Sequence, residues 1–346
     1  MTDPTAAGPG ATSVAGAAGV AGAMADAGGS RGSVRPARAA GGSTRVVRTS
    51  RPVPLGAVLG VFRRGAGDPT SHRDAAGWWF AWRTPDGPVT LRLSAQPTAS
   101  EVTADAWGPG AAWALEQVPA LLGEHDDPTG FAPHHSQVAQ AWRAHGGWRV
   151  PRSGLVLQAL VPSVIEQKVT GQEAFAGYRR LVRRFGEPAP GPGRELRLVV
   201  PPDATGWAGI PSWEWLAAGV DPQRSRTVVR AVRHAGRLEE CADLPTDAAR
   251  ARLRALPGIG RWTWAEVAQR ALGLPDEVSF GDYHVAKDIG WALTGTPVDD
   301  DGLAELLEPY AGHRYRVQRL LELSGAFRPR RGPRMAPRTH LPVRGR

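Results

Sequence analysis

The sequence predicts an α+β protein in which a small N-terminal mixed α/β domain precedes an all-helical domain. Three observations predict this fold class. From about Arg45 to Asp127, short runs of β-branched and aromatic residues are separated by turn residues, which is typical of strands. From about Phe131 onward, apolar residues recur at helical spacing. With 346 residues, of which 42% are hydrophobic, the chain is long enough for two or three domains.

Composition divides the chain into four segments. We expect a disordered arm over 1–44, the mixed α/β domain over 45–127, the helical domain over 128–327 and a basic tail over 328–346. The arm consists mostly of Gly, Ala and Ser, which bury too little apolar surface to offset the loss of chain entropy on folding. The tail carries seven arginines among prolines. Both ends can attract phosphate groups, although solvated ends without a role are the simpler interpretation.

Four runs in the N-terminal domain have the residue types of β-strands. They cover 46–47, 58–62, 78–82 and 89–93. The last two runs are separated by Pro85-Asp86-Gly87, a spacing typical of a β-hairpin. Over 111–122 the apolar residues return at helical spacing, so we expect one helix to close this domain.

The helical domain is predicted from seven periodic segments. They cover 153–168, 173–185, 212–218, 221–236, 246–255, 261–272 and 313–324. Asp221-Pro222 is typical of a helix start, because an Asp caps the helix and a proline fits its first turn. Gly273 and Gly325 stand where glycine commonly ends a helix. The Pro- and Gly-rich stretch 186–193 is predicted to be a loop.

The chain is strongly basic, with a formal net charge of +9 and a pI of about 10.7. Such a balance favours an anionic polymer as partner. Lysine occurs only at Lys168 and Lys287, so almost all basic residues are arginines. A GC-rich genome is an alternative cause of that ratio, and only the sign of the net charge is therefore informative.

A single cysteine, Cys241, limits the kinds of site that the chain can build. It excludes an internal disulfide framework, a Cys-based zinc site and a four-cysteine iron-sulfur cluster. The first residues lack a charged segment that leads into an apolar run, and no run of about 18 apolar residues occurs anywhere. We therefore expect no membrane contact and a cytoplasmic protein.

The most informative segment joins two short predicted helices. It consists of Leu256, Pro257, Gly258, Ile259 and Gly260, and it is followed by Arg261. The glycines permit positive φ angles and close approach of the backbone. The N–H groups of the turn and of the second helix start then point outward and form a phosphate site. A bare Pro-Gly pair would indicate an ordinary helix connection, but the full string is much more specific.

This segment and its continuation resemble the signature of the helix-hairpin-helix DNA glycosylase superfamily. The matching strings are Leu256-Pro-Gly-Ile-Gly-Arg-Trp-Thr263 and Val278-Ser-Phe-Gly-Asp282-Tyr-His-Val285, and Val164-Ile-Glu-Gln-Lys-Val-Thr170 resembles the family's Gln-bearing helix end. The similarity is greatest to the DNA-3-methyladenine glycosylase II family. It covers about 150–325, and for 45–127 it rests on architecture alone.

The resemblance implies that Asp282 is the catalytic carboxylate. Cleavage of an N-glycosidic bond builds positive charge on the sugar, and a fixed carboxylate in a dry pocket stabilises this oxocarbenium-like state until water captures it. The alternative role for Asp282 is that of an ordinary loop residue that caps the helix from Tyr283 onward. His284 matches a position that is often His in the superfamily, and we expect it to make a structural hydrogen bond.

Trp262 stands where bifunctional relatives carry the lysine that forms a Schiff base and leads to strand cleavage. The resemblance therefore implies a monofunctional enzyme. The missing cysteines independently exclude the endonuclease III and adenine-mismatch branches. Trp262 suits a base pocket that stacks on a flipped, cationic base, although core packing is an equal alternative for a tryptophan.

The resemblance also implies contacts with DNA. Gln167, Lys168, the hairpin and Thr263 would bind the duplex, and the backbone carbonyls of Arg254, Leu256 and Ile259 would hold a K⁺ or Na⁺. Lys168 departs from the family, where an apolar wedge tends to follow the Gln, because an ammonium fills a base stack only with its stem. The surroundings of Glu266 and Glu322 are also more acidic than the family's aromatic pocket.

We therefore expect a monofunctional DNA glycosylase of base excision repair. It would flip alkylated purines of the 3-methyladenine type out of double-stranded DNA and hydrolyse their N-glycosidic bond as a monomer, nucleoid-associated if bacterial, without a cofactor for catalysis. One alternative is a non-catalytic helix-hairpin-helix DNA-binding protein, which Lys168 and the acidic pocket positions favour. A less favoured alternative is a bifunctional glycosylase/AP lyase that uses Lys287 or Lys168.

Overall fold

The computed structural model describes residues 41–95 and 100–329. Its N-terminal part is an antiparallel sheet of five strands in the order β1-β5-β4-β3-β2. The strands are β1 (Ser43–Arg48), β2 (Ser71–Asp74), β3 (Gly77–Thr84), β4 (Gly87–Ala95) and β5 (Glu101–Trp107). Helix α2 (Ala111–Leu121) packs on β1, β4 and β5. The predicted hairpin is confirmed, because Thr84 pairs with Gly87 across the two-residue turn.

The predicted strand over 58–62 is wrong. This segment forms the short helix α1 (Leu55–Leu59) and the 3-10 turn η1 (Gly60–Phe62). Val58 and Leu59 are fully buried in the core under the sheet. Because five apolar residues in a row fit a buried helix as well as a strand, periodicity cannot distinguish the two. Strand β1 also starts at Ser43, two residues before the expected start of the mixed α/β domain at Arg45, while 1–40 and 330–346 lie outside the described residues.

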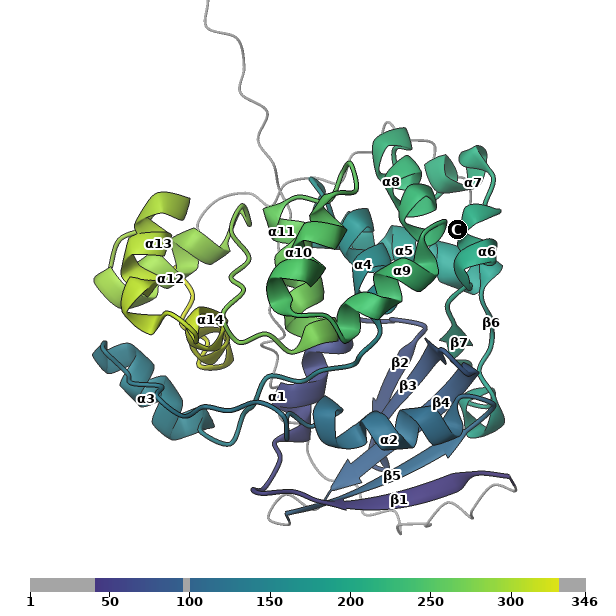
Figure 1. The fold of residues 1–346 in the computed structure, drawn as a ribbon, viewed down its shortest axis with the longest axis horizontal. Helices are drawn as coiled ribbons and strands as arrows, with labels where there is room; N and C mark the ends of the chain where they lie inside the picture. Colours follow the sequence, from purple (N-terminus) through teal and green to yellow (C-terminus); the bar gives the residue numbers. More distant parts are fainter. Residues whose placement is uncertain (1–40, 96–99, 330–346) are drawn as a thin grey trace, which may run out of the picture.

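The helical part has two lobes, and Figure 1 shows the first above the sheet and the second to its left. The first lobe contains α4 (Val156–Ile165), α5 (Gly171–Phe185), α6 (Ala204–Ala208), α7 (Ser212–Ala217), α8 (Pro222–Val232), α9 (Ala235–Glu239), α10 (Thr246–Arg254) and α11 (Arg261–Val267). Helix α4 contacts α5, α8, α9 and α11 and is buried along almost its whole length. An apolar helix of this kind must be enclosed on every side, which makes α4 the centre of this lobe.

The second lobe combines one early helix with the last three. It contains α3 (Ser136–His145), α12 (Val285–Thr294), α13 (Asp300–Leu307) and α14 (Arg314–Leu323), the group at the left of Figure 1. Helix α14 packs on α3 and α12 around buried Leu303, Leu307 and Val317. This lobe also reaches the sheet, because Tyr315 is buried in the sheet's own core.

Two sequence predictions for the helical part need correction. The helix predicted over 221–236 ends at Val232, and α9 follows as a separate helix. The stretch predicted to be a loop over 186–193 contains strand β6 (Glu187–Pro188), which pairs with β7 (Val199–Val200). The helical part is therefore not purely helical. Dipeptide strands have too few residues to show an alternating pattern, so the sequence does not reveal them.

Helix α11 continues without a break into the π-helical turn η4 (Ala268–Leu272). Gly273 ends this turn in the left-handed conformation, with φ 70°, as its position in the sequence predicted. A π-helical turn adds a residue to the helical repeat and changes which side chains share a face. With this change of face, Gln269 and Arg270 of η4 line a cavity.

Candidate functional site

The hairpin between α10 and α11 is exposed and geometrically constrained. Pro257, Gly258 and Gly260 are exposed, whereas Ile259 is buried and anchors the turn in the core of the first lobe. Gly258 has φ 99°, and a Cβ on it would lie 2.3 Å from Oγ1 of Thr227. Only glycine fits that position. Gly260 has φ −91° and open space around it, so its backbone is accessible from outside.

Gln167 connects the end of α4 to the hairpin. Its Nε2 donates to the carbonyl of Gly258 at 2.9 Å and to Oγ1 of Thr263 at 2.8 Å. The next residue, Lys168, is exposed and has φ 56°, a left-handed conformation that is uncommon for residues other than glycine. The structure thus brings Gln167, Lys168 and Thr263 beside the hairpin, with Lys168 on the outside.

The first turn of α11 lies against the segment that carries Asp282. The guanidinium of Arg261 stacks on the ring of Phe280, with its Cζ 3.6 Å from the ring centroid. Trp262 is half-buried, and its Cβ lies 4.0 Å from where a Cβ would stand on Gly281. Trp262 therefore lies against the chain just before Asp282, and it is not among the residues that line the cavity at Asp282.

A cavity of about 800 Å³ lies where the sheet unit and the two helical lobes meet. One wall comes from α1 and η1, a second from α11 and η4, and a third from α14. Asp282, His284 and Val285 close it at the start of α12. Apart from Trp78, Phe175, Tyr315 and Phe327, its larger lining side chains are mostly charged groups or amides.

Asp282 is buried in the cavity wall with only 5% of its surface exposed. Its Oδ1 accepts the backbone N–H groups of His284, at 2.7 Å, and Val285, at 3.2 Å. Its Oδ2 is buried and has no hydrogen-bond partner among the residues that the structure describes. One carboxylate oxygen is therefore fixed by the backbone at the start of α12, and the other is left for a ligand.

Burial raises the pKa of Asp282 to about 7, against an ordinary value near 4. The negative charges of Glu266 and Glu322 raise this pKa further, while the two backbone N–H groups oppose the increase by stabilising the ionised form. A carboxyl group with such a pKa exchanges its proton near neutral pH, which is typical of functional sites.

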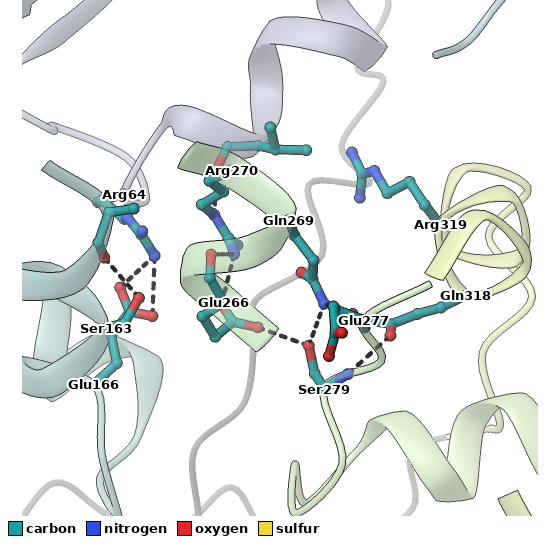
Figure 2. A network of polar contacts seen from close by, with 12 residues as sticks. Arg64, Ser163, Glu166, Glu266, Gln269, Arg270, Glu277, Ser279, Gln318 and Arg319 are labelled. Carbon is teal, nitrogen blue, oxygen red and sulfur yellow. Dashed lines mark hydrogen bonds and ion pairs between the residues drawn. The ribbon is translucent and has the colours of Figure 1, made fainter. Parts of the chain in front are cut away.

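A network of polar side chains holds the segment before Asp282 in place (Figure 2). Glu266 accepts from Nη1 of Arg270 at 2.7 Å and from Oγ of Ser279 at 2.8 Å. Nε2 of Gln269 donates to the same Ser279 oxygen at 2.9 Å and to the carbonyl of Glu277 at 2.7 Å. The α11–η4 segment therefore holds the chain in place just before Asp282 through hydrogen bonds to Glu277 and Ser279.

Two further charged clusters line the cavity. On the sheet side, Arg64 pairs with Glu166 at 2.8 Å, and burial raises the pKa of Glu166. On the α14 side, Glu322 accepts from Gln318 at 3.0 Å and from Arg319 at 2.9 Å. Sequence reasoning singled out Glu266 and Glu322 but missed these partners. Arg64 and Glu166 are 102 positions apart, so no local pattern marks their pair. Gln318 and Arg319 lie four and three residues before Glu322, a spacing that does place side chains on one helix face.

The carbonyls predicted to hold a cation come from the end of α10 and the turn after it. The last carbonyls of a helix lack intrahelical donors, so this position suits a hard cation. The Leu256 carbonyl accepts from the N–H of Ile259 at 3.1 Å and keeps a second lone pair.

Over 41–95 and 100–329, no cluster of three or more His, Cys, Asp or Glu residues is arranged to bind a metal. Within the same residues, no helix is long and apolar enough to span a membrane.

Comparison with solved structures identifies the fold. A 3-methyladenine DNA glycosylase from Archaeoglobus fulgidus superposes with a TM-score of 0.66 at 16% identity, over 81% of this chain and 98% of that one. An 8-oxoguanine glycosylase/lyase from Clostridium acetobutylicum, in complex with double-stranded DNA that contains cytosine opposite 8-oxoG, gives a TM-score of 0.58 at 11% identity, over 81% and 94%. This chain has the fold of these DNA glycosylases.

The likeness is one of fold and not of sequence. No protein-family model matches the chain, and no curated protein matches it. The α+β fold class that the sequence predicted is confirmed, because the matches cover both the sheet unit and the helical lobes. At identities of 11–16%, the roles of individual residues rest on the site's own geometry.

Proposed function

We propose that this protein is a DNA glycosylase that hydrolyses the N-glycosidic bond of a damaged nucleotide, with Asp282 as the catalytic carboxylate. The observation that carries this proposal is the environment of Asp282. Its carboxylate is buried at the wall of a cavity, one oxygen is fixed by two backbone N–H groups, and the other is unpartnered. An extruded base needs such a cavity, and a glycosidic bond needs such a carboxylate.

The reaction follows from the charge that develops on the sugar. As the C1′–N bond breaks, the bonding electrons leave with the base and the sugar becomes oxocarbenium-like. The ionised carboxylate of Asp282 stabilises this charge in a poorly hydrated site, where electrostatic attraction is stronger than in water. Water then attacks C1′ and loses a proton, which leaves an abasic site. A protonated Asp282 lacks the charge for this role.

The hairpin supplies the proposed contact with the DNA backbone. Gly258 and Gly260 are exposed, and their N–H groups would bind a phosphate together with those at the start of α11. Arg254 and Arg261 are also exposed there and add positive charge. A K⁺ or Na⁺ on the carbonyls of Arg254, Leu256 and Ile259 would supply further charge for that phosphate.

Lys168 is the side chain best placed to enter the duplex at the position that the base vacates. It is exposed in a strained backbone conformation, and the neighbouring Gln167 is held by the hairpin. Strain of this kind persists only where surrounding contacts enforce it, and it is enriched at functional positions. The aliphatic stem of Lys168 would occupy the gap, with the ammonium beyond it.

For substrate, we propose alkylated purines of the 3-methyladenine type and a monofunctional reaction. The ionised carboxylate of Asp282, with its unpartnered oxygen, favours a cationic base, which is already a good leaving group. Neither lysine lines the cavity that holds Asp282, which supports the monofunctional reaction. Lys168 is on the outer surface, and Nζ of Lys287 lies 3.6 Å from the ring centroid of Tyr283.

The test is release of free base from duplex DNA that carries a panel of alkylated, deaminated and oxidised bases. We expect release of 3-methyladenine by the wild type and a loss of about 10³-fold in Asp282→Asn, the scale expected when a transition-state electrostatic contact is removed. Asn retains the oxygen that accepts from His284 and Val285, so the variant should fold. Activity that survives in Asp282→Asn contradicts the proposal, and a borohydride-trapped covalent adduct would indicate a lyase.

A further inference from the structure

The sheet unit contributes one complete wall of the cavity. This wall is built from Ala57, Gly60, Val61, Arg63 and Arg64 of α1, η1 and the residues after them. Two contacts fix it to the helical lobes. Nε of Arg270 donates to the carbonyl of Val61 at 2.9 Å, and Arg64 pairs with Glu166 at 2.8 Å. The wall is therefore held in a defined position relative to Asp282.

Arg63 differs from the other arginines around the cavity. Arg64, Arg270 and Arg319 are each paired with a glutamate, and the exposed Arg73 lies over the ring of Trp78. Among the described residues, the Arg63 side chain has no hydrogen-bond or ion-pair partner, and its Nε is buried. A buried donor without an acceptor is costly and calls for an explanation.

Gly60 leaves open space on the same wall. It has φ −59°, an ordinary helical value, and a Cβ on it would meet no atom within 4 Å. Neither the backbone nor the packing of the protein requires glycine there, although glycine lowers the stability of a helical turn. In a 3-10 turn, residues i and i+3 lie on the same side, so Arg63 follows directly over Gly60.

These observations assign a ligand contact to the sheet unit. We propose that the segment from Gly60 to Arg63 reads the extruded base, with Gly60 giving the ring room and Nε–H of Arg63 donating to an acceptor atom on the base edge. Ring nitrogens and exocyclic carbonyls both supply such an acceptor. This inference rests on the proposed glycosylase function, and it makes the N-terminal unit a determinant of which base is excised.

The first experiment uses Arg63→Met and Arg63→Lys across the same panel of lesion duplexes. We expect Arg63→Met to lower base release by about 10- to 100-fold on the preferred lesion, the scale of one hydrogen bond to a charged group. The rates of base release on the different lesions should also become more alike. Arg63→Lys keeps the charge but loses the planar Nε–H donor, so we expect a similar loss of discrimination.

A contact between Arg63 and a backbone phosphate would give a different result. Arg63→Met would then weaken binding uniformly across lesions and reduce the salt dependence of binding by about one charge, while Arg63→Lys would restore it. That outcome overturns the proposal, because a phosphate contact carries no information about the base.

The second experiment fills the space in front of Gly60. We expect Gly60→Leu to lower base release at least about tenfold and Gly60→Ala to lower it less, in proportion to the volume that enters the cavity. Neither variant should lower Tm. Gly236→Leu is the matched control, because Gly236 is an exposed helical glycine in α9 whose Cβ would also meet no atom within 4 Å. It should leave base release unchanged.

Extrusion is measured separately, as the fluorescence increase of a 2-aminopurine placed in the duplex. If the wild type extrudes the base but releases none, the catalytic proposal fails, and the variants are judged on extrusion alone. If it releases base and both Gly60 variants match it, the present inference fails while the glycosylase stands. A wild type that neither releases nor extrudes a base overturns both.

Discussion

The two ends of the α11–η4 segment present opposite kinds of chemistry. At its start, the hairpin exposes Gly258 and Gly260, whose only polar groups are those of the backbone. At its other end, Glu266 and Gln269 are each 2% exposed and engage Ser279. One short helix thus connects the exposed backbone of the hairpin to a buried, charged cavity, about ten residues apart.

In the proposed function, this contrast separates DNA binding at the hairpin from chemistry at the cavity. Backbone groups at the hairpin can bind any phosphate and carry no information about sequence or damage. At the cavity end, buried side chains such as Glu266 hold Ser279, and with it the segment that carries Asp282, in one geometry. Changes at the cavity end should therefore have the larger effects on stability, and changes at the hairpin end should act mainly on DNA affinity.

The largest effect is expected for Glu266→Gln at the cavity end. This change leaves the guanidinium of Arg270 without its anionic partner in a buried site, and we expect a loss of about 3–5 kcal/mol in the free energy of unfolding, measured by urea denaturation. Asp247→Asn is the control, because its ion pair with Arg250 is exposed and should contribute less than about 1 kcal/mol. Equal losses of stability in the two variants would contradict the view that the buried cavity end contributes more to stability than exposed ion pairs do.

Asp282→Asn should make the protein more stable at pH 8. The folded pKa of Asp282 is raised to about 7, so its contribution to stability is present below pH 4 and is lost as the pH rises through 7. At about 1.4 kcal/mol per pKa unit, removal of the charge should recover up to about 4 kcal/mol at pH 8 and almost nothing at pH 4. Thermal or urea denaturation at both pH values would test this.

The same pKa predicts the direction of the pH–rate profile. In the proposed mechanism the ionised carboxylate is the active form, so base release by the wild type should rise as the pH increases from 6 to 8, with a midpoint at about 7. Glu266→Gln removes a negative charge that raises this pKa, so the midpoint should move to lower pH. An unchanged midpoint in Glu266→Gln would show that the charge of Glu266 does not affect the pKa of Asp282.

Smaller effects are expected at the hairpin. Gly258→Ala forces a Cβ against Thr227 at a positive φ and should cost about 1–3 kcal/mol of stability, together with DNA affinity. Gly260→Ala meets no atom within 4 Å and should leave stability almost unchanged, while its methyl group hinders the approach of a phosphate. Unfolding measurements on this matched pair would report the effect on stability, and fluorescence anisotropy would report the effect on DNA affinity.

The sequence by itself determined the fold class and the elements whose signal is local. The hairpin at 256–260 and the β3–β4 turn each depend on a few consecutive residues whose backbone preferences fix their conformation. The placement of Asp282 shortly after the hairpin is likewise a matter of spacing along the chain. The chemical roles of these residues are proposals that the experiments above can test.

Only the tertiary structure decided what surrounds Asp282. Arg64 meets Glu166 across 102 positions, and Arg270 meets the Val61 carbonyl across 209. In a sequence, such charged residues are indistinguishable from solvated surface groups, because their burial depends on which distant elements pack together. The same reason explains why 58–62, an ambiguous apolar run, became a helix that forms a wall of the cavity.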